Sequence, residues 1–254
     1  MALKAKLKNN ELTIGSWITI GHPSVVEVMA TAMFDWLCID MEHTSIDLYM
    51  AQILITTIQS KNIKALVRVS KNEEVIIKKV LDMGADGIIV PMINTKEDAM
   101  NAIKFAKYPP AGERGVGLYR AHGYGTDFEK YKKWVEEEIV IIAQVEHFKA
   151  SENIDDILRV DGIDGTIIGP YDLSGSIGYP GEFDRNDVQL AIENIKLSCK
   201  RNNKPYGFHV IETAPEGLQQ KINDGCTFLA YSVDFFFLGD SARDGMQVIK
   251  RGLV

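Results

Sequence analysis

Residues 63–93 read IKALVRVSKNEEVIIKKVLDMGADGIIVPMI, and this stretch decides the fold. Its two ends, Ile63–Val69 and Gly87–Ile93, are short and almost continuously apolar, which is typical of strands covered on both faces. Between them Asn72–Met83 has helical spacing, with Asn72 as the expected N-cap and Gly84 just past the end. A strand, a helix and a strand in succession predict two parallel strands joined by a right-handed crossover.

The same alternation continues from this unit to both ends of the chain. The other predicted strands are Ser16–Gly21, Trp36–Met41, Ile139–Val145, Gly165–Gly169, Pro205–Val210 and Phe228–Val233. The other predicted helices are one opened by Pro23, then Ile46–Gln59, Thr95–Lys107, Ala150–Leu158, Asn186–Lys200, Ala214–Asn223 and Ala242–Arg251. Eight strand–helix pairs in 254 residues predict an α/β chain whose residues 1–254 form a single TIM (β/α)8 barrel domain. A doubly wound open sheet is the alternative, but no GxGxxG motif follows the first predicted strand.

Composition excludes several classes of partner. The chain is 46% hydrophobic and 25% charged, as in an ordinary globular protein. Its net charge of -7 argues against nucleic-acid binding, which needs basic surfaces. No apolar stretch approaches the roughly 20 residues that span a bilayer, and the N-terminus lacks a signal-peptide pattern. Three scattered cysteines without metal-site spacing fit a reducing compartment, so we expect a cytoplasmic protein that binds neither nucleic acid nor membrane.

Polar side chains follow the apolar runs at the carboxyl end of most predicted strands. These residues are Asp40, Glu42, His43, Arg68, Gln144, Glu146, His147, Tyr171, Asp172, His209 and Asp234. In a TIM barrel the carboxyl ends of the strands meet at one rim, where reacting groups gather. Each residue also has a structural interpretation: Asp172 as a helix cap, Arg68 as an ion-pair partner of Asp40 or Glu42, and His43 as a hydrogen-bonded structural histidine. Their joint placement favours a site.

The residue types at this rim suit metal-assisted chemistry. Glu146 and Asp172 offer the oxygen ligands that Mg²⁺ or Mn²⁺ prefers, and His147 beside them would suit a softer metal. The guanidinium of Arg68 fits a carboxylate or a developing enolate oxygen, and His43 can exchange protons near neutral pH. No predicted strand carries an obvious interior lysine, which argues against Schiff-base catalysis.

The longest interruption of the pattern is Tyr108–Gly125, YPPAGERGVGLYRAHGYG. We expect this segment to lie over the mouth of the barrel, because long loops in compact domains are usually functional. Arg114 and Arg120 among its glycines suit a loop that faces an anion or another subunit, and an ordinary solvated loop is the alternative.

Several motifs resemble the HpcH/HpaI aldolase family. They are FDWLCIDMEH, LVRVS, VLDMGADGIIVPMI, YPPAGERGVG, QVEH and IGPYDLSGSIGYPG, and they occur in family order from Gly15 to about residue 182. The resemblance implies a barrel of the phosphoenolpyruvate/pyruvate type. It also implies a class II aldolase that uses Mg²⁺, Mn²⁺ or Co²⁺ to cleave or form 4-hydroxy-2-oxo acids. The products of cleavage are pyruvate, released through its enolate, and an aldehyde.

The resemblance also assigns roles to individual residues. Glu146 and Asp172 correspond to the metal ligands, while Gln144, Tyr171 and Asp172 correspond to the segments that contact the 2-oxo acid. Arg68 would stabilise the enolate, and His43 would act as the base. Asp82 matches an aspartate that raises the basicity of this histidine from a neighbouring subunit. The family further implies a homo-oligomer, a hexamer or trimer of dimers, with C-terminal helices exchanged between subunits.

Two departures from the family pattern fall beside the predicted site. Tyr171 stands where a small residue is common, and His147 replaces a common threonine. Both bear on the identity of the aldehyde more than on the enolate chemistry. Two other functions remain open at this stage: a lyase of the citrate-lyase-β or malyl-CoA type, and a barrel that binds a 2-oxo acid without turning it over.

Overall fold

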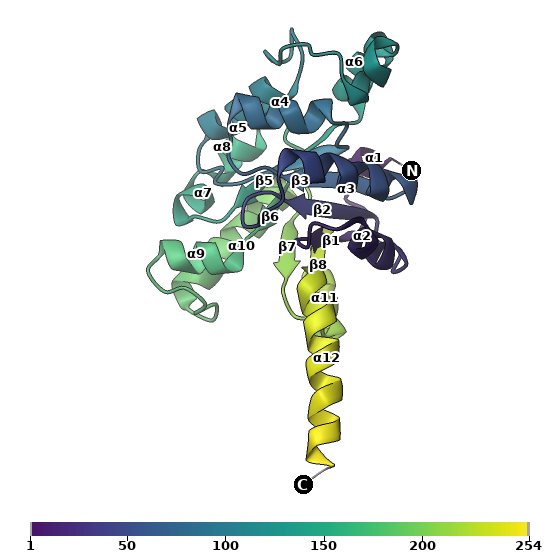
Figure 1. Ribbon diagram of the computed structural model, residues 1–254. Helices are drawn as coiled ribbons and strands as arrows, with labels where there is room; N and C mark the ends of the chain where they lie inside the picture. Colours follow the sequence, from purple (N-terminus) through teal and green to yellow (C-terminus); the bar gives the residue numbers. More distant parts are fainter. Residues whose placement is uncertain (1, 253–254) are drawn as a thin grey trace.

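The computed structural model describes residues 2–252 and shows a closed barrel of eight parallel strands, each hydrogen-bonded to the next and β8 to β1 (Figure 1). The strands are β1 Thr13–Ile18, β2 Trp36–Asp40, β3 Lys64–Arg68, β4 Gly87–Val90, β5 Val140–Val145, β6 Gly165–Ile168, β7 Gly207–Val210 and β8 Phe228–Val233. This confirms the predicted TIM barrel. β8 has the predicted bounds, whereas β1 begins and ends three residues earlier than predicted.

Helices alternate with the strands, and most of these helices pack around the outside of the barrel. They are α1 Leu3–Lys8, α2 Pro23–Ala30, α3 Leu48–Ser60, α4 Glu74–Asp82, α5 Lys96–Ala106, the 3₁₀ helix η1 Arg120–Gly125, α6 Phe128–Glu137, α7 Phe148–Glu152, α8 Ile154–Leu158, α9 Pro170–Ser176, α10 Asn186–Arg201, α11 Pro215–Asn223 and α12 Asp234–Arg251. Pro23 occupies the first turn of α2 as predicted. The N-cap of α4 is Glu73 rather than Asn72, whose amide instead donates to the Asp98 carbonyl. In the part of the chain that the structure describes, no helix is long and apolar enough to cross a membrane.

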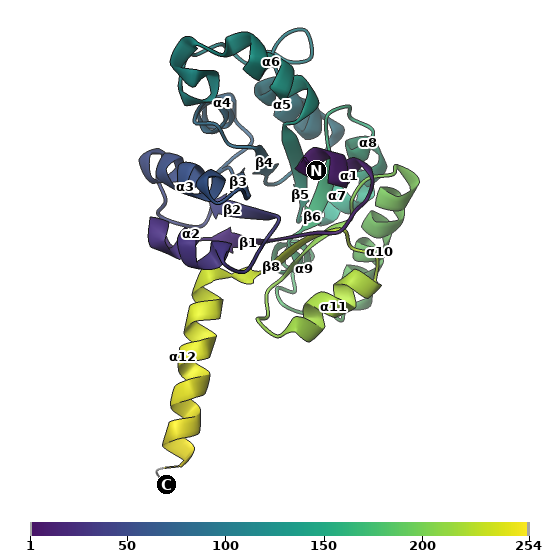
Figure 2. The same cartoon turned by 90° about the vertical axis from the view of Figure 1, so that its right-hand side faces the viewer.

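The short helix α1, which the sequence did not predict, closes one end of the barrel. Figure 2 looks onto the amino-terminal ends of the strands and shows α1 lying across them. Its Leu3 and Leu7 are buried in the same cluster as Trp36 and Phe228, which stack 4.5 Å apart inside the barrel. A Cβ on Gly15 would lie 2.0 Å from the Trp36 ring, so only glycine leaves room for that indole. The barrel is therefore sealed at this end and opens at the other.

The segment Tyr108–Gly125 does not lie over the mouth of the barrel, so that expectation is wrong. It follows a helix instead of a strand, and it packs near the C-terminal ends of α3 and α4. Arg120 donates to the carbonyl of Met83 and to Gln59, at 2.8 Å each. Arg114 is 1% exposed and pairs with Asp82 at 2.6 Å, so it is neither solvated nor free to face an anion. The loop braces the outer helices.

The C-terminal helix also differs from its prediction, since α12 starts at Asp234, eight residues before the expected Ala242. The first residue, Asp234, is buried and accepts from the backbone of Thr19 and Ile20 at 2.8 Å each. Beyond this anchor the helix projects away from the barrel (Figures 1 and 2). Several of its large apolar side chains are exposed: Phe235, Leu238, Met246, Val248 and Ile249.

Candidate active site

A cavity of about 800 Å³ opens at the carboxyl ends of the strands. Five of the seven predicted site residues line it, namely His43, Arg68, Gln144, Tyr171 and Asp172. A sixth, Glu146, is buried beside it against Gln144. The predicted convergence at one rim is therefore what the structure shows. The other lining residues are Trp17, Thr19, Ile20, Asp40, Thr44, Ser45, Ile167, Ile168, Gly169, Pro170, His209, Ile211, Val233, Phe235 and Phe236.

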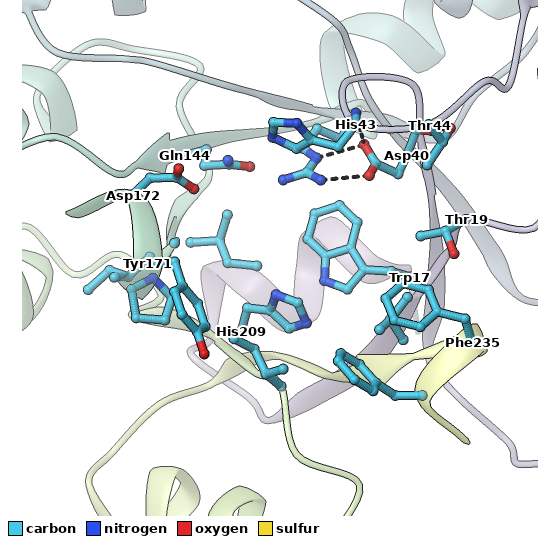
Figure 3. Close-up of a pocket in the computed structure, with 18 of the residues that line it drawn as sticks. Trp17, Thr19, Asp40, His43, Thr44, Gln144, Tyr171, Asp172, His209 and Phe235 are labelled. Carbon is cyan, nitrogen blue, oxygen red and sulfur yellow. Dashed lines mark hydrogen bonds and ion pairs between the residues drawn. The ribbon is translucent and has the colours of Figure 1, made fainter. Parts of the chain in front are cut away.

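Arg68, the last residue of β3, is held by Asp40, the last residue of β2. Its Nε and Nη2 donate to the two oxygens of the Asp40 carboxylate at 2.9 and 2.7 Å (Figure 3). The same carboxylate accepts from the backbone N–H groups of Glu42 and His43, at 3.0 and 3.3 Å. Burial acts to raise the pKa of Asp40, but the hydrogen bonds and charge of Arg68 outweigh it and lower that pKa. Asp40 thus fixes both the guanidinium and the turn that carries His43.

Glu146 and Asp172 meet at Gly169, between the end of β6 and the start of α9. A Cβ placed on Gly169 would lie 3.4 Å from Glu146 Oε2 and 3.5 Å from Asp172 Oδ2. Glu146 Oε1 accepts from the backbone N–H of Met92 at 2.8 Å, and its Oε2 accepts from the Gln144 amide. Burial raises the pKa of Glu146, and the charge of Asp172 adds to that rise. The absent side chain at Gly169 leaves the two carboxylates facing one small space.

Asp172 does not cap a helix, so that alternative interpretation is wrong. Gly169 is the N-cap of α9, and Asp172 stands in the first turn with no side-chain capping bond. His147, in contrast, caps α7, because its Nδ1 accepts from the backbone N–H of Lys149 at 3.1 Å. His147 does not line the cavity, which makes it a poor candidate for a metal ligand.

Glu42 is a fourth carboxylate in this region, beside Asp40, Glu146 and Asp172. Its Oε2 lies 3.4 Å from Arg68 Nε and 3.6 Å from His43 Nε2, and it is buried without a hydrogen-bond partner. Burial raises the pKa of Glu42 to about 7; the charge of Arg68 opposes this rise, and the charges of Glu146, Asp40 and Asp172 add to it. The imidazole of His43 is 61% exposed at the mouth, where an incoming molecule can reach it.

The residues present fit a divalent cation. Asp40, Glu42, Glu146 and Asp172 gather around one permanent cation, Arg68, and the Gln144 Oε1 atom is buried without a partner. Across residues 2–252, no three His, Cys, Asp or Glu side chains are arranged as a metal cluster. A hard cation held by two carboxylates, with the remaining positions taken by water and substrate oxygens, requires only Glu146 and Asp172.

Asp82 is the one predicted site residue that lies elsewhere. It ends α4 and is not among the residues that line the cavity, and its Oδ1 pairs with Arg114. Its Oδ2 would lie 3.3 Å from a Cβ on Gly117. Within one chain, Asp82 and His43 are not brought together. The role given to Asp82 by resemblance therefore remains a prediction about a second subunit.

Two aromatic parts of the cavity wall were not predicted as site residues. Trp17 on β1 has its ring centroid 4.4 Å from Arg68 Cζ and 5.5 Å from the ring of His209 on β7. Phe235 and Phe236, at the start of α12, line the cavity beside them. Trp17 belongs to the predicted strand Ser16–Gly21 as well as to β1, but the sequence of a strand buried on both faces does not show which side chains point into the barrel.

Comparison with known proteins places the chain in a family. A profile described as HpcH/HpaI aldolase/citrate lyase matches residues 13–239. A 2-keto-3-deoxy-L-rhamnonate aldolase from Escherichia coli O9:H4 (strain HS) is 36% identical over 254 residues, covering 98% of this chain and 93% of that protein.

Solved structures agree with this placement. The crystal structure of an HpcH/HpaI aldolase/citrate lyase family protein from Burkholderia cenocepacia J2315 has a TM-score of 0.92 at 28% identity, covering 98% of both chains. A citrate synthase has a TM-score of 0.87 at 27% identity, covering 99% of this chain and 98% of the other. The chain belongs to the HpcH/HpaI aldolase/citrate lyase family, a family of carbon–carbon lyases.

Proposed function

We propose that this chain is a divalent-metal-dependent class II aldolase that cleaves or forms 4-hydroxy-2-oxo acids, with pyruvate and an aldehyde as the other side of the reaction. The observation that carries the proposal is the pair of carboxylates, Glu146 and Asp172, facing one space at Gly169 in the cavity that Arg68 also lines. The activity of the 36% identical relative suggests a 2-keto-3-deoxy sugar acid as the substrate class.

Each step is assigned to residues at the mouth. His43 accepts the proton of the 4-hydroxyl, the C3–C4 bond breaks, and its electrons pass into the enolate of pyruvate as the aldehyde carbonyl forms. Arg68, fixed by Asp40, lies where it can stabilise the negative enolate oxygen. A metal held by Glu146 and Asp172 would supply Lewis-acid stabilisation of the same charge. His43 returns its proton to C3, which completes pyruvate.

The alternatives are less well supported by this cavity. A CoA ester would bring a phosphorylated tail, and Arg68 is the one Lys or Arg among the residues that line the cavity. A binding barrel without turnover would not need the exposed imidazole of His43 beside a buried guanidinium. Neither alternative explains the whole arrangement.

Proton exchange tests the proposal without knowing the aldehyde. With Mg²⁺, Mn²⁺ or Co²⁺ present, the protein is expected to exchange the methyl protons of pyruvate with D2O. Glu146→Gln and Asp172→Asn are expected to lose Mn²⁺ binding, seen by electron paramagnetic resonance, together with exchange. Asp156→Asn, which changes an exposed carboxylate paired with Arg159, serves as the matched control and is expected to behave as wild type. Bound Mn²⁺ without exchange would favour the non-catalytic barrel.

We further propose that the working form is a homo-oligomer in which Asp82 reaches His43 of the partner subunit. A groove of about 490 Å³ runs beside Asp82, and Tyr49, Leu118 and Tyr119 expose large aromatic or aliphatic surfaces along it. A neighbouring carboxylate raises the pKa of an imidazole, so Asp82→Asn is expected to move the acidic limb of the rate profile to lower pH. An unchanged profile in an intact oligomer would remove Asp82 from the mechanism.

A further inference from the structure

The carboxyl end of β8 contains one extra residue relative to β1. Gly15 lies opposite Ala230. Two residues further along β1, Trp17 lies opposite Val233, which is three residues further along β8. Within this bulge Ser232 is buried and has a φ of 49°, a left-handed conformation that is unfavourable for a residue with a side chain. Such strain persists only where the surrounding structure holds it, and bulges at barrel rims re-aim the chain beside a site.

Hydrogen bonds to both neighbouring strands hold the bulge. Ser232 Oγ donates to the carbonyl of Ile211, which follows β7, at 2.8 Å. From β1, Ser16 Oγ donates to the carbonyl of Tyr231 at 2.8 Å. The Nε2 atom of His209 lies 3.3 Å from the carbonyl oxygen of Ser232. Ile211 and His209 line the cavity, so the bulge is built into the cavity wall.

The bulge places Asp234 next to the end of β1. This residue is the first of α12 and is buried. Its Oδ2 accepts from the backbone N–H groups of Thr19 and Ile20 at 2.8 Å each. Its Oδ1 accepts from the Thr19 hydroxyl and from the backbone N–H of Phe235, the latter at 2.8 Å. One carboxylate therefore joins the loop after β1 to the start of α12.

The residues that this carboxylate joins line the cavity, together with a neighbour on α12. They are Thr19, Ile20, Phe235 and Phe236. Figure 3 shows Thr19 and Phe235 across the cavity from Asp172, where the proposed metal and pyruvate would bind. This wall therefore faces the part of the substrate that extends beyond pyruvate. Asp234 is not among the lining residues, so it can act on the substrate only through its neighbours.

We propose that Asp234 is a positioning residue, which fixes the loop after β1 and the start of α12 as one wall that binds the aldehyde half of the substrate. A wall that is fixed before the aldehyde arrives loses less conformational freedom on binding, so the aldehyde binds more tightly. This role differs from that of Asp40, which holds the groups that act on the enolate. The inference rests on the aldolase function proposed above.

The test separates aldehyde binding from enolate chemistry. With pyruvate as the partner, Asp234→Ala is expected to raise KM for propanal about tenfold, while exchange of pyruvate protons with D2O stays within about twofold of the wild type. Asp234→Asn keeps one side-chain oxygen that can accept from the two backbone N–H groups, and it is expected to recover part of the loss. Asp244→Asn makes the same change at an exposed position of α12 and is the control.

Thr19→Val guards against a folding defect in the variants of Asp234. It removes the hydroxyl that donates to Asp234 Oδ1 and keeps the backbone bonds, so KM for propanal is expected to rise about threefold. In the Asp234→Ala background the same substitution is expected to have no further effect, because both changes break the same bond. Full additivity of the two changes would overturn the joint wall, since Thr19 would then act on the aldehyde without Asp234.

Proton exchange distinguishes failure of this inference from failure of the aldolase proposal. An unchanged KM in folded Asp234→Ala would overturn the inference alone. An equal loss of exchange and condensation in that variant would reduce Asp234 to a structural role. Absence of exchange in the metal-loaded wild type would overturn the aldolase proposal, and this inference with it.

Discussion

Arg68 and Asp40 form a bidentate ion pair between the ends of two adjacent strands, with N–O distances of 2.9 and 2.7 Å. The side chains are 14% and 4% exposed. Removing one charge of a buried pair typically costs about 3–5 kcal/mol. The Asp40 carboxylate also holds the turn before His43, so its loss affects two reacting groups at once.

Asp40→Asn is therefore expected to lower kcat by about 10²-fold, because the guanidinium is no longer fixed against the developing enolate. Pyruvate exchange measures this effect, and urea unfolding measures the loss of stability. Asp156→Asn again serves as the control. Unfolding at lower urea with full exchange would show that Asp40 stabilises the barrel without positioning Arg68.

Divalent metal is expected to raise the melting temperature of the wild type. Glu146 and Asp172 face one space, and a cation offsets their like charges. Binding at a hundredfold excess over Kd stabilises a protein by about 2.7 kcal/mol. Glu146→Gln is expected to abolish the rise, and EDTA to reverse it in the wild type. An equal rise in both proteins would place the ion elsewhere.

Arg114 is expected to be a major contributor to stability. It lies under the rings of Tyr108 and Tyr131, with Cζ at 4.8 and 5.5 Å from their centroids, and pairs with Asp82. Arg114→Met is expected to lower the free energy of unfolding by about 3–5 kcal/mol, since Asp82 loses its partner. Arg120→Met, in the same loop but partly exposed, is the comparison and is expected to cost less. Equal losses of unfolding free energy in the two variants would contradict a special role of Arg114 in holding the loop to the outer helices.

Much of the architecture could be predicted because it depends on local patterns. Apolar runs and helical spacing revealed all eight strands, and the polar residues that end them revealed most of the rim. The pairing of Arg114 with Asp82 could not be predicted, because it joins residues 32 positions apart through tertiary packing. His147 was considered as a metal ligand because it follows Glu146 in the sequence. Its capping bond to Lys149 could not be predicted, since that bond depends on the turn after β5. The direction of Trp17 could not be predicted, because β1 is buried on almost its whole length and its sequence does not show which side chains point into the barrel.

Acid is expected to destabilise the wild type through His209. Its folded pKa of about 4 lies below the ordinary value of 6.5, so the unfolded chain takes up a proton first as the pH falls. The contribution of neutral His209 to the stability of the fold is complete above about pH 6.5 and is lost as the pH falls towards 4. Between pH 7 and 4.5 the wild type is expected to lose about 2–3 kcal/mol relative to His209→Leu.

The comparison with His209→Leu is needed because Glu42 acts in the opposite direction. Burial raises its pKa to about 7, so protonation of Glu42 favours the folded state as the pH falls from 7. Urea unfolding of both proteins at the two pH values isolates the histidine. Parallel losses in the two proteins would mean that folding does not lower the pKa of His209.

The exposed apolar side chains of α12 are expected to be covered by a second copy of the chain, as the exchange of C-terminal helices predicts. Leu238 and Val248 are 67% and 70% exposed. Replacing both with lysine is expected to reduce the molar mass in light scattering, whereas lysine at the exposed Asp244 is not. The wild-type melting temperature is also expected to rise with protein concentration. If the wild type is a monomer and its melting temperature does not change with protein concentration, a second copy of the chain does not cover α12.

The position of Trp17 between a guanidinium and an imidazole has an optical consequence. The chain has three tryptophans, and Trp36 is sealed inside the barrel while Trp134 stacks on Tyr131 on the outside. Only the emission of Trp17 should respond when a molecule enters the cavity and changes the electric field along its indole. Subtracting the spectrum of Trp17→Phe from that of the wild type then gives a fluorescence signal for occupancy. The protein thus carries its own reporter, with which unreactive substrate analogues can be titrated directly.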